Sequence, residues 1–415
     1  MQPNAAKRNQ FVDIMRGIAM LLVVLGHTMT GCTVGSQKTF LFNIVWSLQM
    51  PLFILISGYI TKYSRLICDK KDLWQYIKRR TIAYMLPWTV WSFLIRGILF
   101  GQKNFLNIKD LLWSMDSGYW FLATIWTISM VFGIASFVAE RVSKGNMPKK
   151  QIVLLLCYLA GMVLLAGIGV LLGLSFFAIK LTLYYMPFYY AGFLYGQFDG
   201  KVMASKIGKK MVDGIIALCF VIWLYVILRY SLYELTDSVF SIILRAVTSL
   251  AGCIAVCGLC KGIFSDKIGG GAGMGRKAFA GSVPHALPAS QHDQAEQNPC
   301  SLQPSGTDLG VSELYCHSSS HGVDNNGVKQ KQNTEICANG KVKSFFSWAG
   351  KRSLEIYMIH GLLLNVFKSD AVIQFCSIEG YLLTASNFAL TIGLCAAVIS
   401  LLKQNIILKK ILNIR

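Results

Sequence analysis

Long apolar runs separated by short polar connections fill most of this chain. A transmembrane helix needs about 20 mostly apolar residues, and segments of about that length follow one another along the sequence. They are 12–31, 41–61, 81–101, 119–139, 152–172, 174–196, 211–229, 239–260, 353–369 and 382–402. The pattern predicts an all-α fold, a polytopic membrane bundle of about ten transmembrane helices.

Local sequence sets two boundaries in this series of segments: the end of the first segment and the turn between the fifth and sixth. The first segment lacks a clear small-residue cleavage site and more spans follow it, so we interpret it as a membrane helix and not as a signal peptide. The fifth and sixth segments are separated by a very short turn near Gly173.

The composition agrees with a membrane protein. Hydrophobic residues make up 54% of the chain and charged residues 14%, whereas soluble domains carry about 25% charged residues. The net charge is +20. Because this charge is divided among short loops, it indicates membrane topology and not nucleic-acid binding.

The loop charges also predict which helix ends face the cytoplasm, where loops hold an excess of Lys and Arg. Lys and Arg, counted together, are frequent in 62–80, 140–151, 199–210 and the end of the chain after 402. The loops between them are poor, with one Lys in 32–40, two in 102–118 and neither type in 230–238 or 370–381. This alternation predicts that both termini are cytoplasmic.

One polar stretch interrupts the series of spans. Residues 265–344 are rich in Gly, Ser, Gln, Asn and His and hold almost no apolar run, which is typical of a flexible segment that buries no core. The predicted organisation is therefore spans one to eight in 1–264, a cytoplasmic insertion in 265–344, and spans nine and ten in 345–415. We expect the insertion to be dispensable for activity.

Cysteine and histidine residues in the insertion do not predict a metal site. Cys300, Cys316, His317, His321 and Cys337 match no common zinc spacing. The twelve cysteines are scattered through the chain and indicate no disulfide framework. No metal and no bound cofactor are predicted.

The first apolar segment carries the most informative polar residues. His27 lies eleven positions after Arg16, which is about three helical turns, so the two side chains share one face roughly 16 Å apart along the axis. Asp13 precedes Arg16 by three positions and can pair with it. Charged and titratable groups in a membrane helix are costly and by default functional. The alternative is that Arg16 extends to the cytoplasmic surface and His27 is a hydrogen-bonded packing residue.

Further candidate pocket residues stand in the second and fourth segments. They are Gln49, Ser57 and Tyr59, and Trp120 at the start of the fourth. Ser57-Gly58 is also compatible with close helix packing. Trp120 is also compatible with the aromatic belt at a membrane surface.

Two other groups contain candidates for the chemistry. Lys78-Arg79-Arg80 precedes the third segment, where basic residues suit an anionic donor but also suit ordinary cytoplasmic loop topology. Ser353, Tyr357 and His360 have the i, i+4, i+7 spacing of one helical stripe. Hydrogen bonding between helices is the alternative interpretation of that stripe.

Taken in order, these blocks resemble the membrane acyltransferase-3 family, most of all its branch similar to fucose O-acetyltransferases. The resemblance covers nearly the whole chain apart from 265–344. It rests on Asp13-Ile14-Met15-Arg16-Gly17 with Gly26-His27, Met50-Pro51-Leu52-Phe53 through Ser57-Gly58-Tyr59, Lys78-Arg79-Arg80 leading to Pro87-Trp88, Tyr119-Trp120-Phe121-Leu122, Pro187-Phe188-Tyr189-Tyr190-Ala191-Gly192, and Gly350 to His360.

The resemblance implies a multi-pass enzyme of the bacterial inner membrane that moves an acyl group, usually acetyl from acetyl-CoA, to a hydroxyl of a cell-surface or lipid-linked glycan. Arg16 and His27 stand at the positions of the family's essential pair. The implied partners are acyl-CoA as co-substrate, the glycan or lipid-linked sugar acceptor, and membrane lipids. Two positions depart from the pattern, because Gln49 stands where a His is usual and Ala83-Tyr84 where a further basic residue is frequent.

The implied chemistry is physically reasonable for these residues. Acyl transfer to a hydroxyl needs a base, which a neutral histidine near pH 7 can be. CoA phosphates favour Arg partners, and we expect Arg16, Arg79 and Arg80 to bind the donor. A covalent acyl-histidine relay stays open.

Two functions from other classes also stay open. A lipid-linked glycan transporter or flippase would have intramembrane charges too, but the halves show no inverted repeat. An inactive, sensor-like relative would explain the insertion but not His27.

Overall fold

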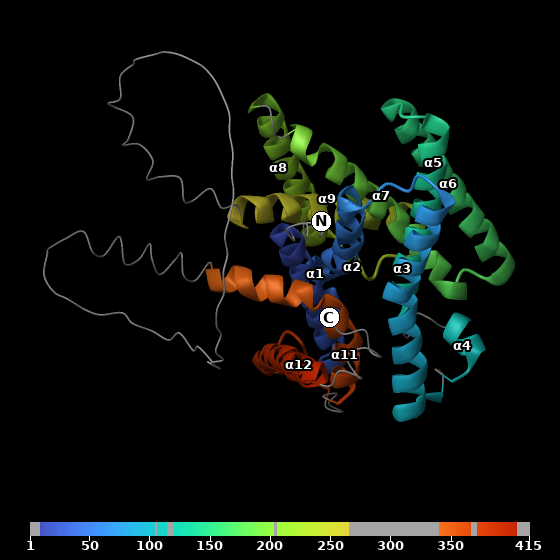
Figure 1. Ribbon diagram of the computed structural model, residues 1–415. Helices are drawn as coiled ribbons and strands as arrows, with labels where there is room; N and C mark the ends of the chain where they lie inside the picture. Colours follow the sequence, from blue (N-terminus) through green and yellow to red (C-terminus); the bar gives the residue numbers. More distant parts are fainter. Residues whose placement is uncertain are drawn as a thin grey trace, which may run out of the picture. The chain divides into compact units, whose positions relative to one another are not determined.

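The chain folds into a bundle of helices in the computed structural model, which describes residues 9–103, 106–113, 119–202, 206–264, 340–366 and 372–404 (Figure 1). These residues belong to one compact unit, Met1–Ser265 with Gly340–Arg415. The predicted insertion lies outside the described residues, apart from 340–344, which are helical. The helix therefore starts before the predicted boundary.

The helices follow the predicted apolar segments in order, and the described residues contain no strand. Their bounds are α1 (Gln10–Cys32), α2 (Phe40–Tyr59), α3 (Lys70–Thr89) continued by the π-helical Val90–Leu99, α4 (Ile108–Trp113), α5 (Trp120–Ser143), α6 (Met147–Leu172), α7 (Ile179–Val202), α8 (Lys206–Arg229), α9 (Val239–Phe264), a helix at 340–351, α11 (Ser353–Val366) and α12 (Ile378–Gln404).

Eight helices of the described ranges are long and apolar enough to cross a membrane, which confirms the predicted all-α membrane bundle. Two predicted spans, now α7 and α11, do not reach that standard. The tyrosines of α7 lower its hydropathy. The 14 residues of α11 extend about 21 Å, less than the roughly 30 Å hydrocarbon core.

The boundary between the fifth and sixth segments lies where it was predicted. The helix α6 ends at Leu172, and Gly173 adopts a φ of 96°, a backbone conformation that glycine tolerates far better than other residues. A short helical turn, Phe176–Ala178, then leads into α7.

Polar side chains cap the N-termini of several helices. Asn9, Thr39, Asp69 and Asn146 precede α1, α2, α3 and α6, and each accepts a hydrogen bond from a backbone N–H of the first turn. Such caps satisfy donors that have no partner within the helix. They account for the starting points that hydrophobicity alone leaves open.

Glycine pairs bring two sets of helices into close contact. Gly58 and Gly192 lie where α2 packs on α7, and Gly17 and Gly350 lie where α1 packs on the helix at 340–351. A Cβ atom on any of the four would collide with a backbone carbonyl of the facing helix. Small residues at such positions let membrane helices approach closely, so Gly58 fits the packing interpretation of Ser57-Gly58.

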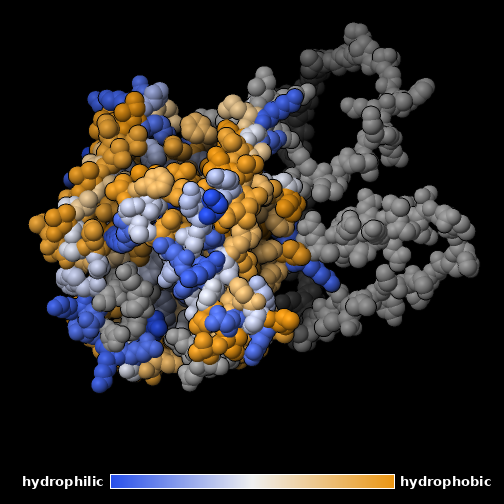
Figure 2. Space-filling view, turned by 180° about the vertical axis from the view of Figure 1, so that it is seen from behind, coloured by the Kyte–Doolittle hydropathy of each residue, from blue (hydrophilic) through white to orange (hydrophobic). Residues whose placement is uncertain are grey.

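The helix α1 lies among α2, α9, α11 and α12 and contacts all four (Figure 1). Large apolar side chains are instead exposed on outer helices such as α6, where Val163, Val170 and Leu171 are among the most exposed. Hydrophobic side chains also cover much of the face in Figure 2. Apolar surface of this extent suits lipid.

Candidate active site

Arg16 and His27 share α1 but line two different cavities. Arg16 is half-buried and lines a cavity of about 200 Å³, here called the arginine cavity. His27 is exposed and lines a second cavity of about 660 Å³, here called the histidine cavity. Met50 of α2 lines both. The two candidate catalytic residues therefore lie on either side of Met50.

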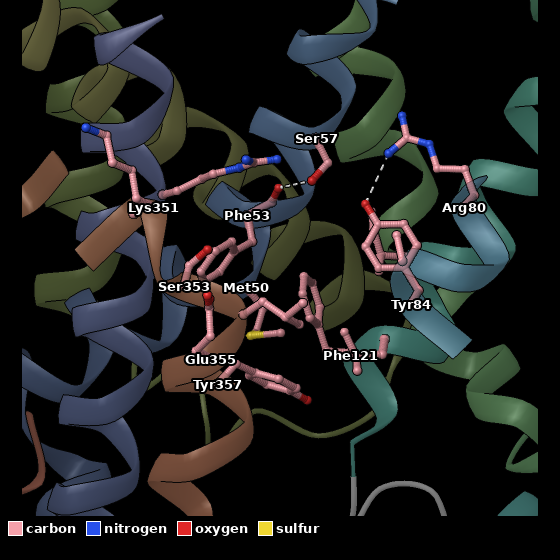
Figure 3. A pocket seen from close by; sticks show the side chains of 16 residues that line it. Met50, Phe53, Ser57, Arg80, Tyr84, Phe121, Lys351, Ser353, Glu355 and Tyr357 are labelled. Atoms are coloured by element: carbon pink, nitrogen blue, oxygen red, sulfur yellow. Dashed lines mark hydrogen bonds between the residues drawn. The ribbon is translucent and has the colours of Figure 1, made fainter. Parts of the chain in front are cut away.

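The arginine cavity collects charges from several helices (Figure 3). Arg16, Arg80 and Lys351 line it together with a single carboxylate, Glu355. Glu355 is only 5% exposed and forms an ion pair with Arg352 at 3.5 Å. Three cations against one carboxylate make this cavity suitable for an anionic group.

Hydroxyl groups complete the polar lining of the arginine cavity. Figure 3 shows Ser57 donating to the carbonyl oxygen of Phe53 at 2.8 Å and Arg80 donating to the hydroxyl of Tyr84 at 3.2 Å. Ser353 also lines this cavity. Tyr84 thus binds a neighbouring arginine of its own helix.

The basic motif before the third span is divided by the helix. Arg80 lines the arginine cavity, whereas Arg79 is exposed and its Nε donates to the carbonyl oxygen of Gln75 at 3.2 Å. Consecutive helical residues point about 100° apart. Only one of the two predicted donor-binding arginines of this motif thus lines the cavity.

The histidine cavity has an aromatic wall beside its polar groups. Trp120 stacks on Tyr185 with ring centroids 5.9 Å apart and an interplanar angle of 13°, and both residues line the cavity with His27 and Gln49. The Oε1 atom of Gln49 is buried with no hydrogen-bond partner among the described residues. It is therefore available to accept a hydrogen bond from a ligand.

A small ionic network borders the same cavity. Asp237, in the loop between α8 and α9, pairs with Lys180 at 3.0 Å and with Arg245 at 3.2 Å. The hydrogen bonds from Lys180 and Arg245 hold the pKa of Asp237 below its usual value. Arg245 also donates to the carbonyl oxygen of Leu232 at 2.9 Å, so it fixes the loop.

Ring contacts of Tyr357 and His360 on α11 extend from the arginine cavity to His27. Tyr357 lines the arginine cavity, and its ring lies 5.8 Å from that of His360. The ring of His360 in turn lies 5.3 Å from that of His27. His360 is 4% exposed, and its Nδ1 lies 2.9 Å from the carbonyl oxygen of Ile356. Since a carbonyl oxygen only accepts, Nδ1 carries the proton of the neutral ring.

Three of the predicted pocket residues are buried and line neither the arginine nor the histidine cavity: Asp13, Tyr59 and His360. Asp13 and Tyr59 are each 2% exposed. Tyr59 accepts a hydrogen bond from Lys62 and packs on other aromatic rings. Its place in the motif therefore reflects packing at the end of α2.

Sequence reasoning did not select several residues that line the cavities. They are Tyr84, Lys351, Glu355, Tyr185 and Asp237. The available signal for the ionic network was Asp237 in loop 230–238, together with Lys180 and Arg245 on the neighbouring helices.

Comparisons with known proteins identify one family model and two curated relatives. A family model described as "Acyltransferase domain" matches residues 9–267, which include Arg16, His27 and Arg80. The Nodulation protein NolL of Sinorhizobium fredii is 25% identical over 240 residues, which cover 53% of this chain and 58% of that protein. The Nodulation protein NolL of Mesorhizobium japonicum is 27% identical over 200 residues, or 46% of this chain and 48% of that protein.

The chain thus spans about half the length of the curated relatives it matches. No solved structure matches it.

Proposed function

The chain belongs to the acyltransferase family whose domain model matches residues 9–267, and from this premise we propose that it is a membrane O-acyltransferase that uses acyl-CoA, most simply acetyl-CoA, to acylate a hydroxyl of a cell-surface or lipid-linked glycan. The observation that carries the proposal is the pair of cavities on either side of Met50. One holds three cations and the other holds His27.

The donor occupies the arginine cavity in this proposal. CoA phosphates form strong, charge-assisted hydrogen bonds with Arg and Lys. A volume of about 200 Å³ is below the roughly 300–1,000 Å³ of sites that enclose a drug-sized ligand. The cavity therefore holds the arm of CoA, while the phosphates lie toward its mouth, where Lys351 is exposed.

The acceptor hydroxyl occupies the histidine cavity, whose volume of about 660 Å³ accommodates a sugar ring. His27 takes the hydroxyl proton as the oxygen attacks the thioester carbonyl carbon. The new C–O bond forms, the C–S bond breaks, and the leaving thiolate takes up the proton. Gln49 has no titratable group, so its role is to accept a hydrogen bond from the sugar that receives the acyl group.

We place the protein in the cytoplasmic membrane of a bacterium with both termini inside. The excess of Lys and Arg in alternate loops supports this orientation. The arginine cavity then takes its donor from the cytoplasm, where CoA thioesters are made.

The test is acyl transfer by purified protein in lipid nanodiscs. The probes are ¹⁴C-acetyl-CoA and a panel of methyl glycosides of fucose, rhamnose, galactose and N-acetylglucosamine. We expect release of CoA thiol that depends on one of the sugars, with the label recovered as an alkali-labile ester. A transporter or flippase would consume no thioester, and absence of both thiol release and ester with every probe would reject the proposal.

A further inference from the structure

Met50 lies between the two cavities, and its burial suits a gate. It lines both the arginine cavity and the histidine cavity, and it is 7% exposed. In Figure 3 its side chain lies within the arginine cavity together with Phe53, Phe121 and Tyr357. Among the residues that line the two cavities, Met50 is the one that both share.

The other walls of this region are aromatic. The ring of Phe121 lies 5.6 Å from that of Phe53 and 5.6 Å from that of Tyr357. From Tyr357 the contacts continue through His360 to His27. A series of rings therefore leads from the arginine cavity to the candidate base.

Apolar surroundings of this kind admit the acyl end of an acyl-CoA but not its phosphates. Phosphates cannot leave water and cationic partners for a hydrocarbon-like environment without a large cost. A thioester and its acyl chain can enter such an environment. The cations therefore retain the phosphates toward the mouth of the arginine cavity, the arm of CoA lies within it, and the acyl end extends past Met50 toward His27.

We propose that Met50 is the gate that sets which acyl group reaches His27, so that it selects short acyl chains. This inference rests on the proposed function, since it concerns the donor of that reaction. Methionine suits the task because it is unbranched, has three rotatable bonds and adapts to a passing group. A shorter side chain leaves room for longer acyl groups, and a rigid aromatic ring leaves less room.

The experiment compares CoA thiol release from acetyl-CoA and butyryl-CoA, with the methyl glycoside that gives the highest wild-type rate. Met50→Ala is expected to raise the ratio of the butyryl rate to the acetyl rate about tenfold or more, the scale on which pocket size discriminates methylene groups. Met50→Phe is expected to lower it. Met50→Leu is expected to change it little, because the two side chains have similar volumes.

Met29→Ala is the matched control. Met29 is a fully buried methionine of α1 that lines neither cavity, so its loss is expected to leave the ratio unchanged. If Met50→Ala does not yield a monodisperse protein, Met50→Phe and the wild-type donor series provide the test.

The failures of the two proposals differ. A wild-type protein that uses acetyl-CoA, with the same ratio in Met50→Ala and Met50→Phe, overturns the gate and leaves the proposed function standing. A wild-type protein that uses neither donor overturns both.

Discussion

The arginine cavity and the histidine cavity share α1 and α2 but differ in how their charges are held. The charges of the arginine cavity come from Arg16, Arg80, Lys351 and Glu355 on four different helices. Those of the histidine cavity gather where the loop around Asp237 meets α7 and α9. His27 is left beside Gln49 and the aromatic wall. One cavity is thus arranged to hold an anion, and the other to expose a single base.

Under the proposed function, this difference assigns donor binding to the arginine cavity and the chemistry to His27. Changes in the arginine cavity should affect the use of the donor, and changes around His27 should affect turnover. The largest effect is expected at the base itself, and the smallest at the surface network.

His27→Ala is expected to lower turnover about 10²- to 10⁴-fold, the usual contribution of a general base, while the affinity for acetyl-CoA stays near the wild-type value. Turnover and donor binding are measured separately in nanodiscs. Thr30→Ala, one turn further along α1 and also exposed, is the control. Wild-type turnover in a folded His27→Ala protein would contradict the assignment.

Arg16→Ala is expected to raise the Michaelis constant for acetyl-CoA about tenfold or more, because a charge-assisted bond to a phosphate is lost. Arg16→Lys should restore little of this loss, since an ammonium group cannot replace a two-pronged guanidinium contact. The phosphate role is wrong if both variants keep the wild-type Michaelis constant and turnover.

Arg80 and Arg79 form a matched pair, since they are neighbours of identical chemistry of which only Arg80 lines the cavity. Arg80→Ala should raise the acetyl-CoA Michaelis constant severalfold, and Arg79→Ala should leave it close to wild type, as expected for an exposed contact. Steady-state kinetics over a range of donor concentrations measures both. Equal effects of the two changes would show that general positive charge, not the cavity, matters.

The smallest effect is expected at Asp237, whose pKa is lowered from its ordinary value of 3.8. A lowered pKa means that its ion pairs stabilise the loop fully above the ordinary value and are lost as the pH falls through the lowered one. Proteolysis or hydrogen exchange of loop 230–238 should therefore increase below about pH 4. Asp237→Asn should give the looser loop at pH 7 as well. A loop equally protected in both proteins at both pH values would remove Asp237 from this role.

Much of the fold was predictable because membrane helices are set by hydrophobic length. The helix α1, with Arg16 and His27 on one face, follows from spacing alone. The short length of α11 could not be predicted, because a run of apolar residues does not reveal where the backbone leaves the helix.

The division of the site into two cavities was not predictable. It depends on which helices surround α1, and no spacing within α1 contains that information. The same limit explains Arg79 and Tyr59, which belong to the right motifs but point away from both cavities. Asp237 was missed because a loop carboxylate gains its meaning only from Lys180 and Arg245 on other elements.

The contact between Gly17 and Gly350 has a consequence for how the protein is synthesised. The segment that supplies Lys351, Glu355 and His360 leaves the ribosome after the whole region matched by the family model. Until it inserts, the arginine cavity lacks one wall and His27 lacks its neighbouring ring. A nascent chain that ends at Phe264 therefore lacks part of the lining of the arginine cavity. Two fragments divided within 265–339 and produced together should regain a site that neither contains alone.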